Sequence, residues 1–166
     1  SAQYNVAVGV TALDAITTGD KNTAIGYNAL TSNTTGLENV AIGHNALKSN
    51  STASYSIAIG HESLPGSNGG ANVSIGTFSM QGNQTGSHNV SVGYNSLQQN
   101  TTGTRNTSIG RSAGNVITTG SNNVILGHEA NASANNAANQ VVIGSGATGI
   151  GDNKAVIGNA NVTDVY

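Results

Sequence analysis

The chain has 166 residues and a formal net charge of -2 at pH 7, and only 7% of its residues are charged. It has no cluster of Lys or Arg and no apolar stretch near the roughly 20 residues of a membrane helix, so we expect neither a nucleic-acid partner nor membrane insertion. The absence of cysteine excludes a disulfide framework and any thiolate metal site.

A five-residue motif recurs along the chain: Asn, an aliphatic residue, a small residue, a second aliphatic residue and Gly, with Ser, Gln or Lys replacing Asn in three copies. Successive motif glycines are 17 residues apart, except for one interval of 16 and a last one of 14. This register indicates a repeat protein rather than a disordered Gly- and Ser-rich tract. The copies lie at residues 5–9, 22–26, 39–43, 56–60, 72–76, 89–93, 106–110, 123–127, 140–144 and 154–158.

Two further signals follow most copies. A Tyr or His, a polar residue, a small residue and Leu come directly after the motif glycine, as at residues 27–30 and 44–47. A turn containing Gly comes ten residues after that glycine, as at residues 33–36 and 100–103. Asn and Thr favour such turns because their side chains bond nearby backbone groups, and Gly accepts a positive φ.

The motif alternates with period 2 and places β-branched residues at its apolar sites, which predicts a short strand in every copy. Seventeen residues leave room for two short strands and two turns but not for a crossover helix. We therefore predict an all-β fold: a parallel β-roll, or β-solenoid, of about ten 17-residue coils that rises about 4.8 Å per coil. We expect a single repeat domain over residues 1–166, with an irregular shorter coil and a C-terminal cap over residues 145–166.

The rows of stacked side chains can be assigned from the alternation. We expect the aliphatic rows, such as Val6 and Val8, to fill the interior together with a leucine row (Leu13, Leu30, Leu47, Leu64, Met80 and Leu97). The small-residue row between the aliphatic rows would then face outward. Because only small side chains occupy it over the first seven coils, and because one roll buries little apolar surface, we predict an obligate oligomer that packs along this row. The interface candidates are Ala7, Ala24, Ala41, Ala58, Ser74, Ser91, Ser108, Ile125, Val142 and Val156.

A second column follows the motif glycines and contains planar and hydrogen-bonding side chains. It offers ligand-contact candidates, because aromatic and His faces suit sugar rings or a partner surface. Two alternatives stay open: the rings stack on one another and cover the strand edge, or the histidines cluster at an oligomer axis and hold a metal or an anion. The candidates are Tyr27, His44, His61, Tyr94, Arg111 and His128, with Phe78 one position further along its own coil.

The motif asparagines favour a structural ladder, in which side-chain amides bond up and down the stack. The titratable groups are few and form no Ser-His-Asp or zinc-binding pattern. We expect no enzyme, no catalytic residues, no metal ligands and no cofactor. The adjacent residues His128 and Glu129 are expected on a strand, with side chains that face opposite ways. The ladder members are Asn5, Asn22, Asn39, Asn72, Asn89, Asn106 and Asn123.

The Asn-Val-Ala-Ile-Gly unit at residues 39–43 resembles the head repeats of trimeric autotransporter adhesins, which form left-handed parallel β-rolls. The longer unit at residues 22–36 looks even more like repeats of phage and virus tail-fibre proteins, and residues 155–166 are similar to the segment that precedes a chaperone domain in such fibres. The resemblance implies left-handed rolls in a side-by-side homotrimer.

We therefore expect a fragment of a longer extracellular fibre, located on a virion tail fibre or a bacterial cell surface. Its function would be a structural and adhesive module for host attachment, which binds a cell-surface glycan or protein receptor. The alternative is the head of a bacterial adhesin that binds host-surface or matrix ligands. Ice binding is a third hypothesis, but it needs regular Thr rows, and the Thr residues here cluster at turns.

Overall fold

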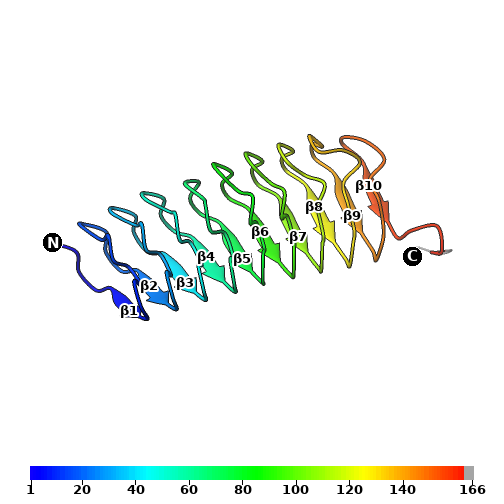
Figure 1. Cartoon of the computed structure of the whole chain (residues 1–166). Coiled ribbons are helices and arrows are strands. Elements are labelled where there is room, and N and C mark those ends of the chain that lie inside the picture. The colour runs from blue at the N-terminus through cyan, green and yellow to red at the C-terminus, as the bar shows by residue number, and fades with distance from the viewer. Residues whose placement is uncertain (163–166) are drawn as a thin grey trace.

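The computed structural model describes residues 1–162 and contains ten strands and no helix in that range (Figure 1). All strands belong to one parallel sheet, in which they follow one another in chain order. Paired residues such as Val6 and Thr23 lie one repeat apart in the sequence. The predicted all-β parallel solenoid with roughly 17-residue coils is therefore confirmed, and it has about nine turns where about ten coils were expected. The strands are β1 (Val6–Val8), β2 (Thr23–Ile25), β3 (Val40–Ile42), β4 (Ile57–Ile59), β5 (Val73–Ile75), β6 (Val90–Val92), β7 (Thr107–Ile109), β8 (Val124–Leu126), β9 (Val141–Ile143) and β10 (Ala155–Ile157).

Each coil contains one three-residue strand, not the two that the spacing suggested. The segment after the motif glycine is a chain of turns, because every second residue there takes a positive φ: 55° at Asn28 and 52° at Leu30. This segment still bonds to the next coil, with the N–H of Leu30 donating to the carbonyl of Ala46 at 2.9 Å. Hydrogen bonding between coils thus continues beyond the strand, although only one side of the coil is a sheet.

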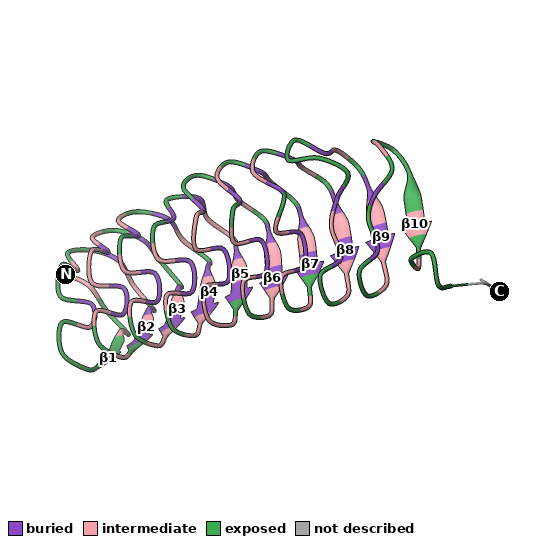
Figure 2. Cartoon of the chain, turned by 45° about the vertical axis from the view of Figure 1, so that its right-hand side comes forward, coloured by how far each residue is buried: buried purple, intermediate pink, exposed green. Residues whose placement is uncertain are grey.

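The small-residue row lies inside the roll, so its assignment to an outward oligomer interface was wrong. Ala or Ser fills the space behind the strand from β2 to β7, and Ile125 and Val142 fill it in β8 and β9. Figure 2 shows the consequence as a buried centre in strands β2 to β9, with less buried residues on either side. Fully buried members are Ala24, Ala41, Ala58, Ser74, Ser91, Ser108, Ile125 and Val142. Ala7 and Val156 hold the same position in β1 and β10, the outermost strands of the described sheet, and they are exposed and half-buried, respectively.

The leucine row is buried as predicted, from Leu13 at 5% exposure to Leu97 at 0%. It ends at Gly114, where an added Cβ would lie 2.6 Å from the Ser108 Oγ and 3.2 Å from the Leu97 Cδ2. Aliphatic volume reappears nearby in Ile117 and Ile125, which are both fully buried. The interior is therefore rebuilt from different positions after the seventh strand.

The small-residue row is matched in size and chemistry to the residue that precedes the leucine row in the previous coil. Ser63 Oγ donates to Ser74 Oγ at 2.9 Å, and Ser79 Oγ donates to Ser91 Oγ at 2.8 Å. Where one member is Ala the other is Ala or a larger aliphatic residue. Ser96 Oγ donates to the carbonyl of Ser108 at 3.0 Å, and the buried Ser108 Oγ has no hydrogen-bond partner among the described residues. The remaining pairs are Ala12 with Ala24, Ala29 with Ala41, Ala46 with Ala58, Ser96 with Ser108, Ala113 with Ile125, Ala130 with Val142 and Ala147 with Val156.

The asparagine ladder is confirmed. The backbone N–H of Asn39 donates to the Asn22 Oδ1 at 3.0 Å, and the Asn22 side-chain amide donates across the coil to the carbonyl of Gly36 at 2.9 Å. Ser56 continues the ladder where Asn is missing, since its N–H donates to the Asn39 Oδ1. A second, buried set of asparagines closes the turns locally, as Asn33 does with both backbone groups of Gly36. From Asn22 onward the ladder is fully buried, whereas Asn5 in the first coil is half-buried. The buried members satisfy polar groups that one narrow roll cannot expose to water.

The last coil is shorter than the others, because Ala155 pairs with Val141 only 14 residues earlier. The expected C-terminal cap over residues 145–166 reaches beyond the described part of the chain at residues 163–166. The cap therefore stays a prediction.

Candidate functional site

The aliphatic rows point away from the interior and form one outward face along the whole sheet. Their exposure is the reverse of the sequence-based expectation: Val8 is 57% exposed, Ile109 43% and Ile75 36%. We call this surface the aliphatic face. Its members are Val6, Thr23, Val40, Ile57, Val73, Val90, Thr107, Val124, Val141 and Ala155 in one row, and Val8, Ile25, Ile42, Ile59, Ile75, Val92, Ile109, Leu126, Ile143 and Ile157 in the other.

The aliphatic face carries no charged residue, and its only polar members are Thr23 and Thr107. Ten strands spaced about 4.8 Å apart make it roughly 43 Å long, and three residues per strand make it roughly 10 Å wide. A projected area on the order of 400 Å² matches the largest apolar patches of soluble monomers, which often mark interaction sites. The face is therefore a candidate interface.

The ring column lies directly after the motif glycines, as predicted, and its candidates are brought into line. Tyr27 stacks on His44 with ring centroids 5.3 Å apart, and His44 stacks on His61 at 5.0 Å. Phe78 takes the next place, edge-on to His61 at 5.3 Å, and meets Tyr94 at 6.0 Å. Phe78 thereby bridges the gap left by Thr77, the residue that follows the motif glycine in that coil.

Stacking decides which part of the ring column a ligand can reach. His44 has a ring on both sides, so its faces are covered while its edge is exposed. Tyr27 and Tyr94 remain 51% and 47% exposed at the two ends of the ring series. A sugar ring cannot stack on the covered faces, but a partner can still form hydrogen bonds with the ring edges.

The last two candidates of the column join a polar cluster instead of the ring series. The Arg111 Nη1 lies 2.7 Å from the Glu129 Oε1 and donates to the His128 Nε2 at 3.0 Å. His128 Nε2 and Glu129 Oε1 are 3.8 Å apart, so the expectation that these side chains face opposite ways was wrong. The reason is that Glu129 sits in a turn with φ 55°, not in a strand.

Among residues 1–162, no group of three or more His, Cys, Asp or Glu side chains is close enough to hold a metal ion. Within the same range there is no helix long and apolar enough to cross a membrane.

One carboxyl group departs from its ordinary behaviour. The backbone N–H of Ala138 donates to Asp152 at 2.8 Å, and this bond, aided by the Gln140 amide, lowers the pKa of Asp152 below its usual value. Asp152 lies at the start of the shortened last coil, where it holds the turn before β10.

The parallel sheet and the repeated coil place the chain in the class of β-solenoid repeat proteins. No family model, curated protein or solved structure matches it.

Proposed function

We propose that the chain is a non-enzymatic structural and adhesive module of an extracellular tail fibre that attaches to a host receptor. In this proposal three left-handed rolls lie side by side in a homotrimer. The observation that carries it is the aliphatic face, which runs the length of the sheet without a charge. Handedness and the number of rolls rest on the resemblance of the repeat to tail-fibre and adhesin repeats.

The interior of a single roll is thin. A regular coil buries one large aliphatic side chain, such as Leu47, beside small residues and amides such as Ala41 and Asn39. Buried apolar area stabilises by about 25 cal/mol per Å², so a roll with few large buried side chains gains comparatively little from its own core. The aliphatic face holds most of the remaining Val and Ile side chains. The exposure of these side chains in a single chain supports the proposal of an obligate assembly, in which copies cover the face.

A closed three-fold assembly turns the same face of each roll toward a common axis. The aliphatic face suits that position because it is uncharged and continuous over all ten strands. The ring column lies beyond the motif glycines, at the edge of this face. Its exposed ring edges are the proposed receptor contacts, since a receptor approaching the fibre would meet them from the side.

The experiment compares two lysine substitutions by light scattering and circular dichroism. Ile59→Lys places a charge in the middle of the aliphatic face, whereas Ser49→Lys places it on an exposed turn away from the sheet. The wild type and the Ser49→Lys variant are expected at about 50 kDa, three times the 16.5 kDa of one chain. The Ile59→Lys variant is expected as a monomer or with loss of β-structure, because three like charges would meet at the axis.

A wild-type monomer that keeps its full β-structure would count against the proposal. The same holds for an Ile59→Lys variant that assembles like the wild type, because the aliphatic face would then not be the interface.

A further inference from the structure

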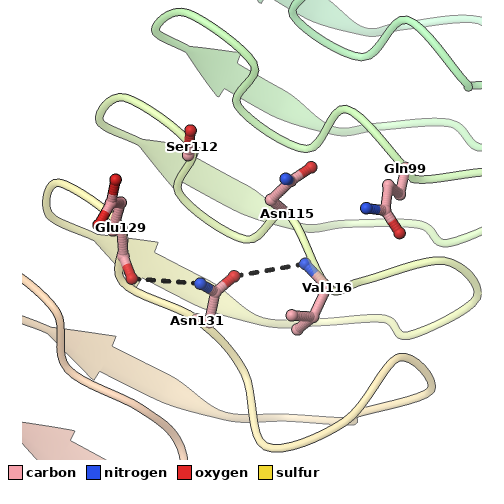
Figure 3. A pocket seen from close by; sticks show the side chains of 6 residues that line it. All are labelled: Gln99, Ser112, Asn115, Val116, Glu129 and Asn131. Carbon is pink, nitrogen blue, oxygen red and sulfur yellow. Dashed lines mark hydrogen bonds between the residues drawn. The ribbon is translucent and has the colours of Figure 1, made fainter.

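A hollow of about 520 Å³ opens on the turn side of the roll, where the leucine row ends. Figure 3 shows six side chains from three successive coils around it, with the amides of Gln99 and Asn115 projecting into the same space. This volume lies in the range of small-molecule sites, about 300–1,000 Å³. The lining residues are Gln99, Ser112, Asn115, Val116, Glu129 and Asn131.

The bonding between coils is interrupted at the hollow. In regular coils one backbone N–H of this turn donates to the next coil, as Ser32 does to Lys48 at 3.1 Å and Gly82 to Gln98 at 2.8 Å. Among the described residues, the equivalent bonds from Gln99 and Val116 are missing, as is the one from Gly66 in the 16-residue coil. The Val116 N–H donates to the Asn131 Oδ1 at 3.3 Å instead, and the Asn131 amide donates to the carbonyl of Glu129. A side-chain hydrogen bond thus replaces the backbone bond between these coils, and the hollow lies at this place.

The lining is polar but balanced in charge. The single carboxylate, Glu129, is paired with Arg111 at 2.7 Å, so neither an anion nor a cation finds a uniform field of opposite sign. The other polar groups are two primary amides, a third amide engaged with the backbone and a hydroxyl, which offer donors and acceptors side by side. Such a mixture matches hydroxyl groups, because each hydroxyl both donates and accepts.

Two further features favour a polyhydroxylated ligand. The Asn115 Oδ1 is shielded from water and has no hydrogen-bond partner in the described part of the chain, although the residue as a whole is only half-buried. Rotation of its amide would turn this acceptor toward a ligand hydroxyl and relieve an unsatisfied group. Val116, 38% exposed, supplies the one aliphatic wall, against which the C–H face of a sugar can pack.

We propose that this hollow binds a neutral saccharide. The inference deepens the proposed attachment function, on which it rests, by naming the class of receptor and a site separate from the ring column. The polar groups come from three consecutive coils, so the site needs the stacked roll but no residue from a second copy.

The test titrates the whole chain with the methyl glycosides of glucose, galactose, mannose and N-acetylglucosamine, and with N-acetylneuraminic acid as an anionic control. Saturation-transfer NMR and the side-chain amide signals of Gln99 and Asn115 report binding. At least one neutral glycoside is expected to shift both amides at millimolar concentration. Gln99→Ala is expected to weaken that binding about tenfold or more, because an exposed amide is removed without loss of core. Ser32→Ala, at the equivalent position of a regular coil, is the matched control and is expected to bind normally.

Three outcomes would overturn the inference: no neutral glycoside shifts these amides, only the anionic sugar does, or binding is unchanged in Gln99→Ala. Light scattering on the same samples separates this inference from the proposed function. A trimer that binds no sugar would refute the saccharide site but would not contradict the proposed fibre module. Sugar binding by a monomer would support the saccharide site and contradict the proposed homotrimer.

Discussion

The motif glycines set the distance between coils, and Gly93 gives the clearest test of that role. Its φ is 137°, a conformation that residues with a Cβ rarely adopt, and an added Cβ would lie 2.5 Å from the Gly110 carbonyl oxygen. The obstacle is backbone of the next coil, so no side-chain rotation can relieve it. Gly93→Ala must therefore both strain its own backbone and push two coils apart.

The size of the effect follows from these two terms. Backbone strain in a region nearly restricted to glycine costs about 1–3 kcal/mol. Separating the coils weakens the bonds from the Gly93 N–H to Ile75 and from the Gly110 N–H to Val92, both 2.8 Å long, at about 1 kcal/mol each. We expect Gly93→Ala to lower the free energy of unfolding by about 4 kcal/mol.

Gly66 is the matched control, because its φ lies outside the positive region and the nearest atom to an added Cβ is the Asn83 oxygen at 3.8 Å. Gly66→Ala is expected to be neutral or to stabilise by about 0.4–1 kcal/mol, since Ala restricts the unfolded chain. Urea unfolding followed by circular dichroism measures both variants. If Gly93→Ala stays within about 1 kcal/mol of the wild type, or if both variants lose the same amount, the reasoning about coil spacing is refuted.

Three further predictions concern the interior and the last coil. Alanine substitutions at Ser79 and Ser91 should each cost about 1 kcal/mol or more, and the double variant should cost less than their sum by about 1 kcal/mol, because it restores a matched Ala pair; an additive urea result would contradict the pairing. Ile117→Ala should cost about 2–5 kcal/mol, since it opens a cavity at a fully buried site, whereas Ile150→Ala, at a 66% exposed position, should stay within about 0.5 kcal/mol in the same assay. The lowered pKa of Asp152 contributes stability that is present above its unfolded value near 3.8 and is lost as the pH falls through the folded pKa. Acid unfolding of the Asp152→Asn variant should therefore lack this loss of stability. Identical acid transitions of variant and wild type would show that the bonds to Asp152 do not stabilise the fold.

The fold class was predictable because period and composition act together. A 17-residue interval with alternating aliphatic residues allows parallel stacking and excludes a crossover helix, and buried asparagines at one position indicate a ladder. The number of strands in a coil was not predictable in this way. Asn28 and Leu30 both take positive φ values, which Asn tolerates but Leu rarely adopts, and the bonds to neighbouring coils stabilise that conformation.

The candidate site was predictable in part. Position after the motif glycine was enough to place Tyr27, His44 and His61 in one column, because parallel stacking puts equivalent residues above one another. The place of Phe78 depended on a turn conformation that the sequence does not display. The hollow beside Asn115 arises from missing backbone bonds, and its only trace in the sequence is Gly114 in place of Leu.

The reversal of the aliphatic and small-residue rows has a physical cause that applies to any narrow roll. Alternation divides the side chains of a strand between two faces but does not say which face is inner. Here one face carries Val and Ile and the other carries Ala, so neither face is polar and polarity cannot identify the outer one. The volume of the side chains determines which row is inner, because the space behind the strand also has to hold Leu47 and Asn39 from the same coil.

The sequence does contain the signal that identifies the inner row. A residue that faces solvent has no reason to match another residue in the previous coil, but one that packs inside must fit its neighbour. Every Ser of the small-residue row has a Ser 11 or 12 residues before it, and every Ala from the second coil onward has an Ala there, while the larger Ile125 and Val142 are each preceded by Ala. Such matching between rows indicates contact, and contact inside a single roll leaves the aliphatic face as the surface that a second copy can cover.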